Sequence, residues 1–297
     1  MGKLQAYLTI ARPANVLSST ADVINGALIA TSALAWSGDN TLLLKGLMLV
    51  LSTACLYAGG IVFNDVFDYD MDRIERPERM IPSGKLTIIE AKRFGICLFS
   101  FGVFFALMVS FSSAALALCI VISAFTYDAK AKHSVVYGPL MMGICRGLNM
   151  LLGISIVSNS IIQHVYLALV PLFYIIGITL ISKCETGRIK KNILDAGFFF
   201  YLLACSGLIT ILLVKEFSLL SILPFLLGFL LLTSIPIIKM QMKVNYGVIR
   251  QAVKNGIIGI ILLDATLTAA YAGPEFALAI LVLLPMSIAL SRYFAVT

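Results

Sequence analysis

A dense acidic run ends a long apolar stretch, where residues 64–72 read Asn-Asp-Val-Phe-Asp-Tyr-Asp-Met-Asp. On a helix at 100° per residue, one arc of about 100° contains four of these side chains, those of Asn64, Asp65, Asp68 and Asp72. Asp70 points to the opposite side. Three carboxylates on one face repel one another unless a cation lies between them. Such hard oxygen ligands suit Mg²⁺ shared with substrate phosphates. We therefore predict that the four residues bind Mg²⁺ and that the three aspartates act in catalysis.

Arginines follow the acidic run. Carried on in helical phase, Arg76 and Arg79 share the face of the acids, until Pro77 breaks the helix. Acids that hold a metal, followed by arginines that hold phosphate, are typical of a site for a diphosphate. We predict that both arginines bind substrate. The alternative is that they pair with the acids and anchor the chain at the membrane surface.

Two later loops carry weaker signals of the same kind. Tyr127 and Lys130 lie three residues apart, so a helix would place them on one face. We predict that Tyr127 binds substrate and that Lys130 contacts a phosphate as a catalytic cation. An interfacial aromatic is the alternative for Tyr127. The next loop reads Ser-Lys-Cys-Glu-Thr-Gly-Arg over residues 182–188. From it we include Lys183, Glu185 and Arg188 among the substrate-binding candidates.

Ionisable and amide side chains also lie inside apolar segments, where they are functional candidates by default. Asp22 and Asn25 share one segment, Arg146 and Asn149 another, and Asp264 lies in a third. We predict that Arg146 and Asn149 bind substrate. A salt bridge of Arg146 with Asp22 or Asp264 is the structural alternative.

The composition requires a membrane. Hydrophobic residues make up 60% of the 297 residues, only 12% are charged, and the mean hydropathy is +0.99. A soluble domain cannot bury that much apolar surface, and continuous apolar runs favour helices over a β-barrel. A solvated acidic loop is thus a poor explanation of residues 64–72. The net charge of +7 is compatible with nucleic acid, but the positions of the charges indicate topology, so we predict no nucleic-acid partner.

The apolar segments predict nine to ten membrane spans in one all-α polytopic domain over residues 1–297, at 16–37, 44–63, 94–110, 112–127, 138–158, 164–182, 196–214, 217–238, 255–272 and 275–291. Nearly all of the 22 basic residues follow even-numbered segments or lie at the chain ends, whereas Lys45 and Lys215 fall on the other side. By the positive-inside rule, the N-terminus and the loops that carry the acids and cations face the cytoplasm.

These motifs together resemble the UbiA superfamily of intramembrane prenyltransferases. The resemblance rests on Asn64-Asp65-x-x-Asp68-x-x-x-Asp72, then Arg76-Pro77 and Ile81-Pro82-Ser83-Gly84, with support from Tyr127-x-x-Lys130 and Arg12-Pro13. It implies a helical bundle with a central cavity that opens sideways to lipid. It also implies Mg²⁺-dependent transfer of an isoprenoid from its prenyl diphosphate to an aromatic or other lipophilic acceptor.

The chain departs from the family pattern after the sixth apolar segment. A second aspartate-rich motif is usual there, but this chain has only Glu185, with Asp195 well beyond. Lys183, Arg188 or Lys190 would then supply the missing positive charge on the diphosphate, or the ionisation step is lost. Residues 182–187 and 145–149 are similar to the divergent EboC-like branch. The alternative function is therefore transport or handling of a lipophilic metabolite. A secondary transporter is a third reading, which leaves the loop acids without a role.

Overall fold

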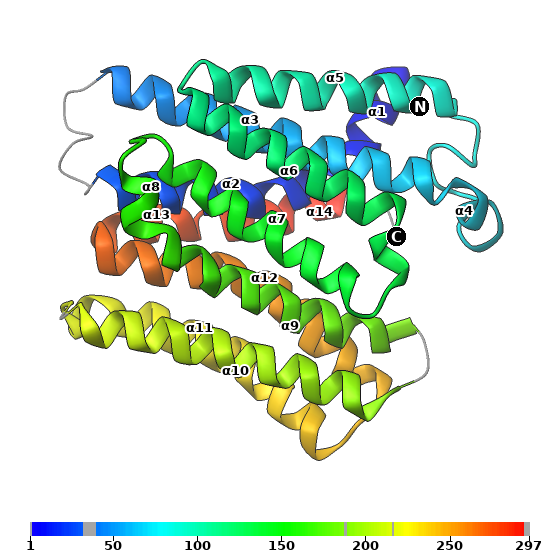
Figure 1. Ribbon diagram of the computed structural model, residues 1–297. Helices are drawn as coiled ribbons and strands as arrows, with labels where there is room; N and C mark the ends of the chain where they lie inside the picture. The colour runs from blue at the N-terminus through cyan, green and yellow to red at the C-terminus, as the bar shows by residue number, and fades with distance from the viewer. Residues whose placement is uncertain (1, 32–39, 187–188, 216, 294–297) are drawn as a thin grey trace.

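The computed structural model describes residues 2–31, 40–186, 189–215 and 217–293, and every regular element among them is helical (Figure 1). In chain order the elements are α1 (Lys3–Ala11), α2 (Pro13–Thr31), α3 (Asn40–Phe67), α4 (Tyr69–Glu75), α5 (Ile88–Leu107), α6 (Phe111–Ala129), η2 (Ala131–His133), α7 (Tyr137–Ile154), α8 (Ser160–His164), η3 (Val165–Ala168), α9 (Leu169–Thr186), α10 (Lys191–Val214), α11 (Leu219–Met242), α12 (Tyr246–Tyr271), α13 (Pro274–Leu281) and α14 (Leu283–Tyr293). Long helices lie side by side along one direction, and the short helices α4 and α8 lie toward opposite ends of the bundle (Figure 1).

The helices coincide with the predicted apolar segments. Each segment matches one helix or consecutive helices, and the part of the first segment beyond Thr31 lies outside the described residues. In the described part of the chain, six helical stretches are long and apolar enough to cross a membrane: α3, α6, Ser160–Glu185, α10, α11 and α12. The all-α polytopic bundle is thus confirmed, and nine to ten remains only an approximate number of spans.

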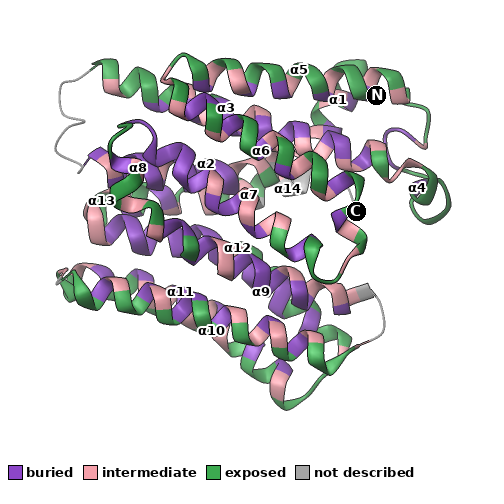
Figure 2. Cartoon of the chain, viewed as in Figure 1, coloured by how far each residue is buried: buried purple, intermediate pink, exposed green. Residues whose placement is uncertain are grey.

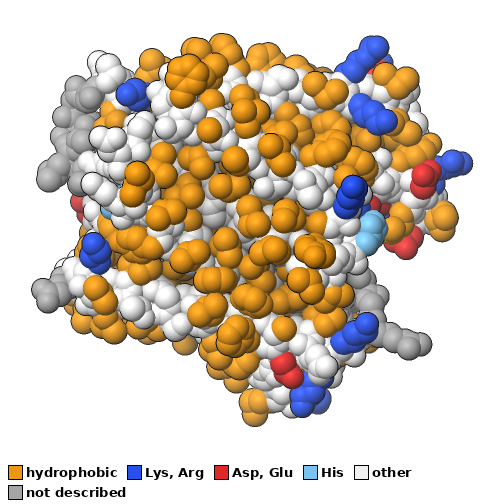
Figure 3. Space-filling model, viewed as in Figure 1, with side chains coloured by type: hydrophobic (Ala, Val, Ile, Leu, Met, Phe, Trp, Pro, Cys, Tyr) orange, Lys and Arg blue, Asp and Glu red, His pale blue; other side chains and the backbone are white. Residues whose placement is uncertain are grey.

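The outer surface of the bundle is apolar. Hydrophobic side chains cover the middle of the visible face, and lysines and arginines lie toward its ends, more of them at the end that carries α4 (Figure 3). The outward faces of α5, α10 and α11 are exposed, whereas α12 is mostly buried (Figure 2). Exposed leucine, isoleucine and phenylalanine side chains over the middle of a bundle are what contact with lipid requires.

Glycines bring α2 and α7 into backbone contact. A Cβ on Gly26 would lie 2.4 Å from the Met150 carbonyl oxygen, and one on Gly153 would lie 2.2 Å from that of Val23. Since such distances are far inside van der Waals contact, neither position tolerates a side chain without moving a helix. Small residues are the usual means of close helix approach in membranes. This contact fixes α2 against α7 and so places Asp22 opposite Arg146.

The acidic run bends at its centre. α3 ends at Phe67, Asp68 adopts a turn conformation, and α4 begins at Tyr69. Backbone hydrogen bonds still link Asp72 N to Asp68 O at 2.8 Å, so the chain continues in nearly helical phase. α4 ends at Glu75, and Arg76 leaves the helical conformation at φ −144° and ψ 62°, as a residue that precedes proline is biased to do. The predicted helix end at Pro77 is therefore confirmed.

A polar cluster lies buried between α2, α7 and α12. Arg146 Nε is 2.7 Å from Asp22 Oδ2, so the salt-bridge alternative is confirmed for Asp22. Asp264 Oδ1 accepts a hydrogen bond from Asn25 Nδ2 at 3.1 Å. The other oxygens, Asp22 Oδ1 and Asp264 Oδ2, are buried without a donor. The guanidinium of Arg146 thus pairs with Asp22, whereas Asp264 is held by the amide of Asn25.

This arrangement predicts unequal effects of two isosteric changes. Asp264→Asn removes a buried charge and can place an N–H at the oxygen that is buried without a donor, so we expect the thermal midpoint in detergent to be kept or raised. Asp22→Asn removes the charge next to Arg146 and should cost about 3 kcal/mol of stability, because breaking a buried ion pair leaves a charge uncompensated. Equal losses for the two variants would contradict this account of the cluster.

Candidate functional site

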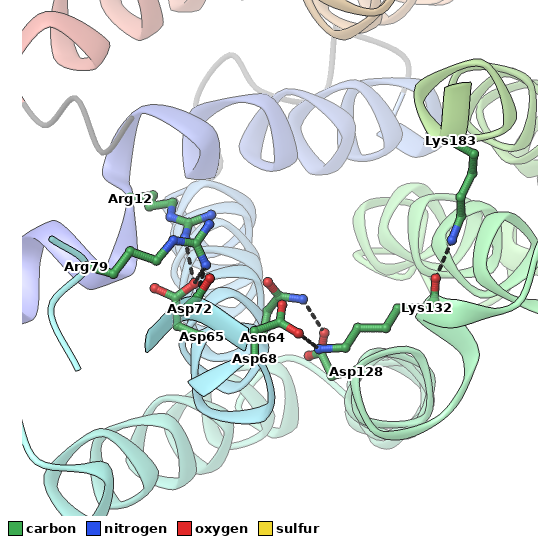
Figure 4. Close-up of polar contacts among 9 residues, drawn as sticks. All are labelled: Arg12, Asn64, Asp65, Asp68, Asp72, Arg79, Asp128, Lys132 and Lys183. Carbon is green, nitrogen blue, oxygen red and sulfur yellow. Dashed lines mark hydrogen bonds and ion pairs between the residues drawn. The ribbon is translucent and has the colours of Figure 1, made fainter. Parts of the chain in front are cut away.

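The predicted site residues gather at the end of the bundle where α1 meets α2, α3 meets α4, and α6 meets η2. Figure 4 shows the side chains pointing toward one another in two groups. Asp65 and Asp72 face the arginines from the α1–α2 junction and the loop after α4. Asn64 and Asp68 face α6 and η2. The four side chains of the predicted acidic face thus divide between its two edges, with Asn64 and Asp68 at one edge and Asp65 and Asp72 at the other. We call the polar side chains labelled in Figure 4 the rim; they are those of Arg12, Asn64, Asp65, Asp68, Asp72, Arg79, Asp128, Lys132 and Lys183.

The first group consists of ion pairs between distant segments. Arg12 lies 2.6 Å from Asp65 Oδ1, and Arg79 lies 3.3 Å from the same oxygen and 2.6 Å from Asp72 Oδ2. The side chains of Asp65, Asp72 and Arg79 are all less than a tenth exposed. The alternative that Arg79 pairs with the acids is therefore confirmed. Asp70, predicted to point away, is exposed.

Arg12 reaches Asp65 through an unusual backbone conformation. It has φ +46° and ψ 65° between α1 and α2, a left-handed conformation that costs a non-glycine residue about 1 kcal/mol or more. Its Nε is buried without a hydrogen-bond partner. The ion pair with Asp65 holds the residue in this conformation and aims the guanidinium at the rim.

The second group joins α3 to α6, η2 and α9. Asn64 Nδ2 donates to Asp128 Oδ1 at 2.8 Å, and Lys132 Nζ contacts Asp68 Oδ1. Lys183 Nζ in turn donates to the backbone oxygen of Lys132. Lys132 is only 9% exposed at its side chain, so its charge is committed to this group.

The other predicted residues lie in different surroundings. Tyr127 lines the cavity described below. Arg76 and Lys130 are exposed and make no ion pair within the described part of the chain. Glu185 pairs with Arg250 at 3.5 Å, and Arg188 lies outside the described residues. The structure thus gathers Lys132 into the rim where the spacing argument favoured Lys130, and the predicted roles of these residues stay predictions.

Sequence reasoning missed Asp128 and Lys132 as site residues and cited Arg12 only as part of a motif. Asp128 had a usable signal, because an acid at the end of an apolar segment is rare in a chain with so few charges. Lys132 had none, since its place depends on the short helix η2 that turns it back toward Asp68.

A cavity of about 470 Å³ extends from the rim into the bundle between α2, α3, α6, α7, α9 and α12. Arg12, Asn64, Tyr127 and Asp128 line it at the rim. Ser18, Thr53, Arg146 and Asn149 are among the polar residues that line it farther in. The walls between are apolar, formed by Leu56, Ile61, Ile120, Met142, Ile175, Ile178, Ile257, Ile260 and Ile261. The cavity can therefore hold a molecule with a charged head and an apolar chain.

The described side chains fit Mg²⁺ in part. No group of three His, Cys, Asp or Glu residues converges into a metal site in the described ranges. Two predicted ligands, Asp65 and Asp72, are engaged by arginines. Asn64, Asp68 and Asp128 nonetheless bring hard oxygen donors together at the mouth of the cavity. Since Mg²⁺ usually takes one or two carboxylates and completes its shell with substrate phosphates and water, this donor set suits it.

The profile of the UbiA prenyltransferase family matches residues 25–240, which is most of the chain. This chain belongs to the UbiA prenyltransferase family. Together with its apolar helices, family membership makes it an integral membrane protein.

Several sequence relatives are named digeranylgeranylglyceryl phosphate synthase. The one from Saccharolobus solfataricus is 29% identical over 186 residues, which is 62% of this chain and 62% of that protein. The one from Thermococcus gammatolerans is 33% identical over 151 residues, 51% of this chain and 52% of that protein. The chain thus matches these relatives over less than two thirds of their length.

Solved structures share the fold. One from work on digeranylgeranylglyceryl phosphate synthase in membranes superposes with a TM-score of 0.72 at 23% identity, covering 93% of this chain and all of that one. A UbiA homologue from Archaeoglobus fulgidus bound to GPP and Mg²⁺ gives a TM-score of 0.53 at 14% identity, covering 97% of this chain and 99% of that one. At these identities the likeness establishes the fold alone.

We predict that Arg76 and Arg79, the two arginines after the acidic run, contribute differently to the free energy of unfolding. Arg79→Ala should lower the free energy of unfolding by about 3–5 kcal/mol, because two buried carboxylates lose a shared cation. Arg76→Ala, the matched exposed control, should stay within about 0.5 kcal/mol of the parent chain. Thermal unfolding in detergent measures both, and similar losses for the two variants would exclude the ion-paired rim described above.

Proposed function

We propose that this protein is a membrane prenyltransferase that moves an isoprenoid from a prenyl diphosphate to a lipophilic acceptor. The observation that carries this proposal is the cavity, which joins a rim of cations and oxygen ligands to apolar walls. A prenyl diphosphate has the same two parts in the same order. The UbiA homologue bound to GPP and Mg²⁺ supports the class of substrate.

In this proposal the rim binds the diphosphate. Arg12, Lys132 and Lys183 supply positive charge from three segments, and Asn64, Asp68 and Asp128 are the residues that would hold Mg²⁺. When bound, Mg²⁺ would neutralise negative charge on the leaving group, the kind of electrostatic assistance that dominates many enzymatic rate enhancements. Asp65 and Asp72 act through Arg12 and Arg79, which they hold at the rim.

The proposed reaction transfers the prenyl group from the diphosphate to the acceptor. The bond between the first carbon of the prenyl chain and the diphosphate oxygen breaks, and the diphosphate leaves with the electron pair. The acceptor atom then bonds to that carbon and releases its proton. Departure of the diphosphate leaves an allylic cation on the prenyl chain. The isoleucine and leucine side chains of the walls exclude water, which would otherwise react with this cation.

The names of the sequence relatives bear on the acceptor, and the distribution of lysine and arginine bears on the orientation of the protein in the membrane. Relatives named digeranylgeranylglyceryl phosphate synthase favour a lipid acceptor of the glyceryl phosphate type over an aromatic one. The excess of lysine and arginine at the end that carries the rim favours a cytoplasmic rim and N-terminus. Soluble or membrane-bound diphosphates would then reach the site from the cytoplasm.

Handling of a lipophilic metabolite without transfer is the competing function. It is favoured by Glu185, the acid in the loop where the second aspartate-rich motif would lie, because it pairs with Arg250 instead of joining the rim. It predicts binding of a prenyl lipid without release of pyrophosphate.

The proposal is tested by incubating the purified protein with geranyl or geranylgeranyl diphosphate, Mg²⁺ and membrane lipids, then measuring pyrophosphate and lipid products by mass spectrometry. We expect turnover that Asp128→Asn reduces at least 100-fold, as is typical when a key electrostatic group is removed. Asp70→Asn, an exposed aspartate of the same acidic run, should leave turnover within about twofold. Prenyl diphosphate binding without pyrophosphate release by the parent chain would favour the competing function.

A further inference from the structure

The inner polar lining of the cavity is built into the bundle. Arg146 and Asn149 come from α7, and Thr53 comes from α3; all three line the cavity and are less than a tenth exposed. Asp22 lies behind them and does not line the cavity. We call Thr53, Arg146 and Asn149 the floor. Buried polar groups at membrane depth are costly unless they are satisfied, so an arrangement of this size calls for an explanation.

The hydrogen bonds of the floor satisfy Asn149 but leave some N–H donors of Arg146 without an acceptor. Asn149 uses both amide hydrogens, on Ser19 O at 2.8 Å and on Asp22 Oδ2 at 2.9 Å, and its oxygen accepts from Thr53 at 2.6 Å. Arg146 pairs with Asp22 through Nε and donates to Ser18 O at 2.7 Å through one terminal nitrogen. A guanidinium carries five N–H donors. Those that remain have no acceptor within the described part of the chain, and Arg146 borders the cavity.

The charge of the floor is already balanced. The positive charge of Arg146 is offset by Asp22, whose Oδ2 lies 2.7 Å from Arg146 Nε, and neither Asp22 nor Asp264 lines the cavity. The cavity walls beside Arg146 are isoleucines, so the surroundings screen charge weakly. An anion bound there would add negative charge to a site that has no cation to spare. An uncharged oxygen would take up the free N–H donors without that cost.

The floor also lies at a useful depth. Ser18, whose carbonyl oxygen holds Arg146, lies five residues beyond Pro13, the first residue of α2 after Arg12, which corresponds to about 7.5 Å at a rise of 1.5 Å per residue. A group held at Arg146 is therefore close to the point where a prenyl chain emerges from a diphosphate bound at the rim.

We propose that the floor binds an uncharged oxygen, a hydroxyl or carbonyl, of the lipophilic acceptor, with Arg146 as the donor. This rests on the proposed function, because it assigns the acceptor to the same cavity. Asn149 and Asp22 are positioning residues that hold the guanidinium in place. The floor then selects acceptors by an uncharged oxygen group, and the rim selects donors by their diphosphate.

The test compares two probes of equal chain length, a monoalkylglycerol and an alkyl phosphate, on the purified full chain in detergent. The rim is first filled with inorganic pyrophosphate and Mg²⁺, so that the alkyl phosphate cannot occupy it, and binding of pyrophosphate is measured separately. We expect the monoalkylglycerol to bind at least 10-fold more tightly than the alkyl phosphate. Tighter binding of the alkyl phosphate would overturn the proposal.

Variants locate the binding. Removing the charge pair as a unit, Asp22→Asn with Arg146→Gln, should weaken monoalkylglycerol binding at least 10-fold. Arg146→Lys keeps a cation beside Asp22 but loses the planar donors, so it should weaken binding too and decides the matter if the double variant does not fold. Tyr201→Phe, which removes a buried hydroxyl between α10 and α11, is the control. Undiminished monoalkylglycerol binding by Arg146→Lys would refute the role of the floor.

Failure of this inference can be told apart from failure of the proposed function. If pyrophosphate with Mg²⁺ does not bind the parent chain, the diphosphate site is refuted, whatever the monoalkylglycerol does. If pyrophosphate binds and monoalkylglycerol binding ignores Arg146, only the floor is refuted.

Discussion

The ion pairs of Asp65 with Arg12 and Arg79 connect the α1–α2 junction, α3 and the loop after α4, and the rest of the rim depends on them. A carboxylate with 5% exposure cannot remain charged near the membrane without cations beside it. Satisfying Asp65 fixes the junction of α1 and α2 and the loop after α4. Because Arg12 lines the mouth of the cavity, its ion pair with Asp65 helps to shape the opening.

A second ion pair, between Asp22 and Arg146, lies deeper in the bundle. Gly26 and Gly153 let α2 and α7 approach until Asp22 meets Arg146, and this contact sets the inner wall of the cavity. The cavity therefore has a polar group at each end and apolar walls between them. This arrangement matches a reaction with one charged and one lipophilic substrate, and it explains why ionisable residues are retained in a chain that is otherwise so apolar.

Much of this could be predicted from the sequence, and the parts that could not have a common physical reason. The apolar runs and the acidic motif depend on local spacing, so the helices, the helix end at Pro77 and the outward direction of Asp70 followed from it. The division of the acids into two groups did not, because it depends on partners from other segments. Lys132 instead of Lys130 contacts Asp68 for the same reason: η2 changes the direction of the chain after α6. Helical phase describes one helix, whereas the rim is assembled from side chains of several segments.

The central claim is that the rim binds a prenyl diphosphate together with Mg²⁺. It is tested most directly by the affinity of the purified protein for a non-hydrolysable prenyl diphosphate analogue, measured by calorimetry with Mg²⁺ and after its removal by a chelator. Because the rim offers oxygen donors that the phosphates of the ligand would complete, we predict affinity at least 10-fold higher with Mg²⁺. An affinity that does not change when Mg²⁺ is removed would contradict the account.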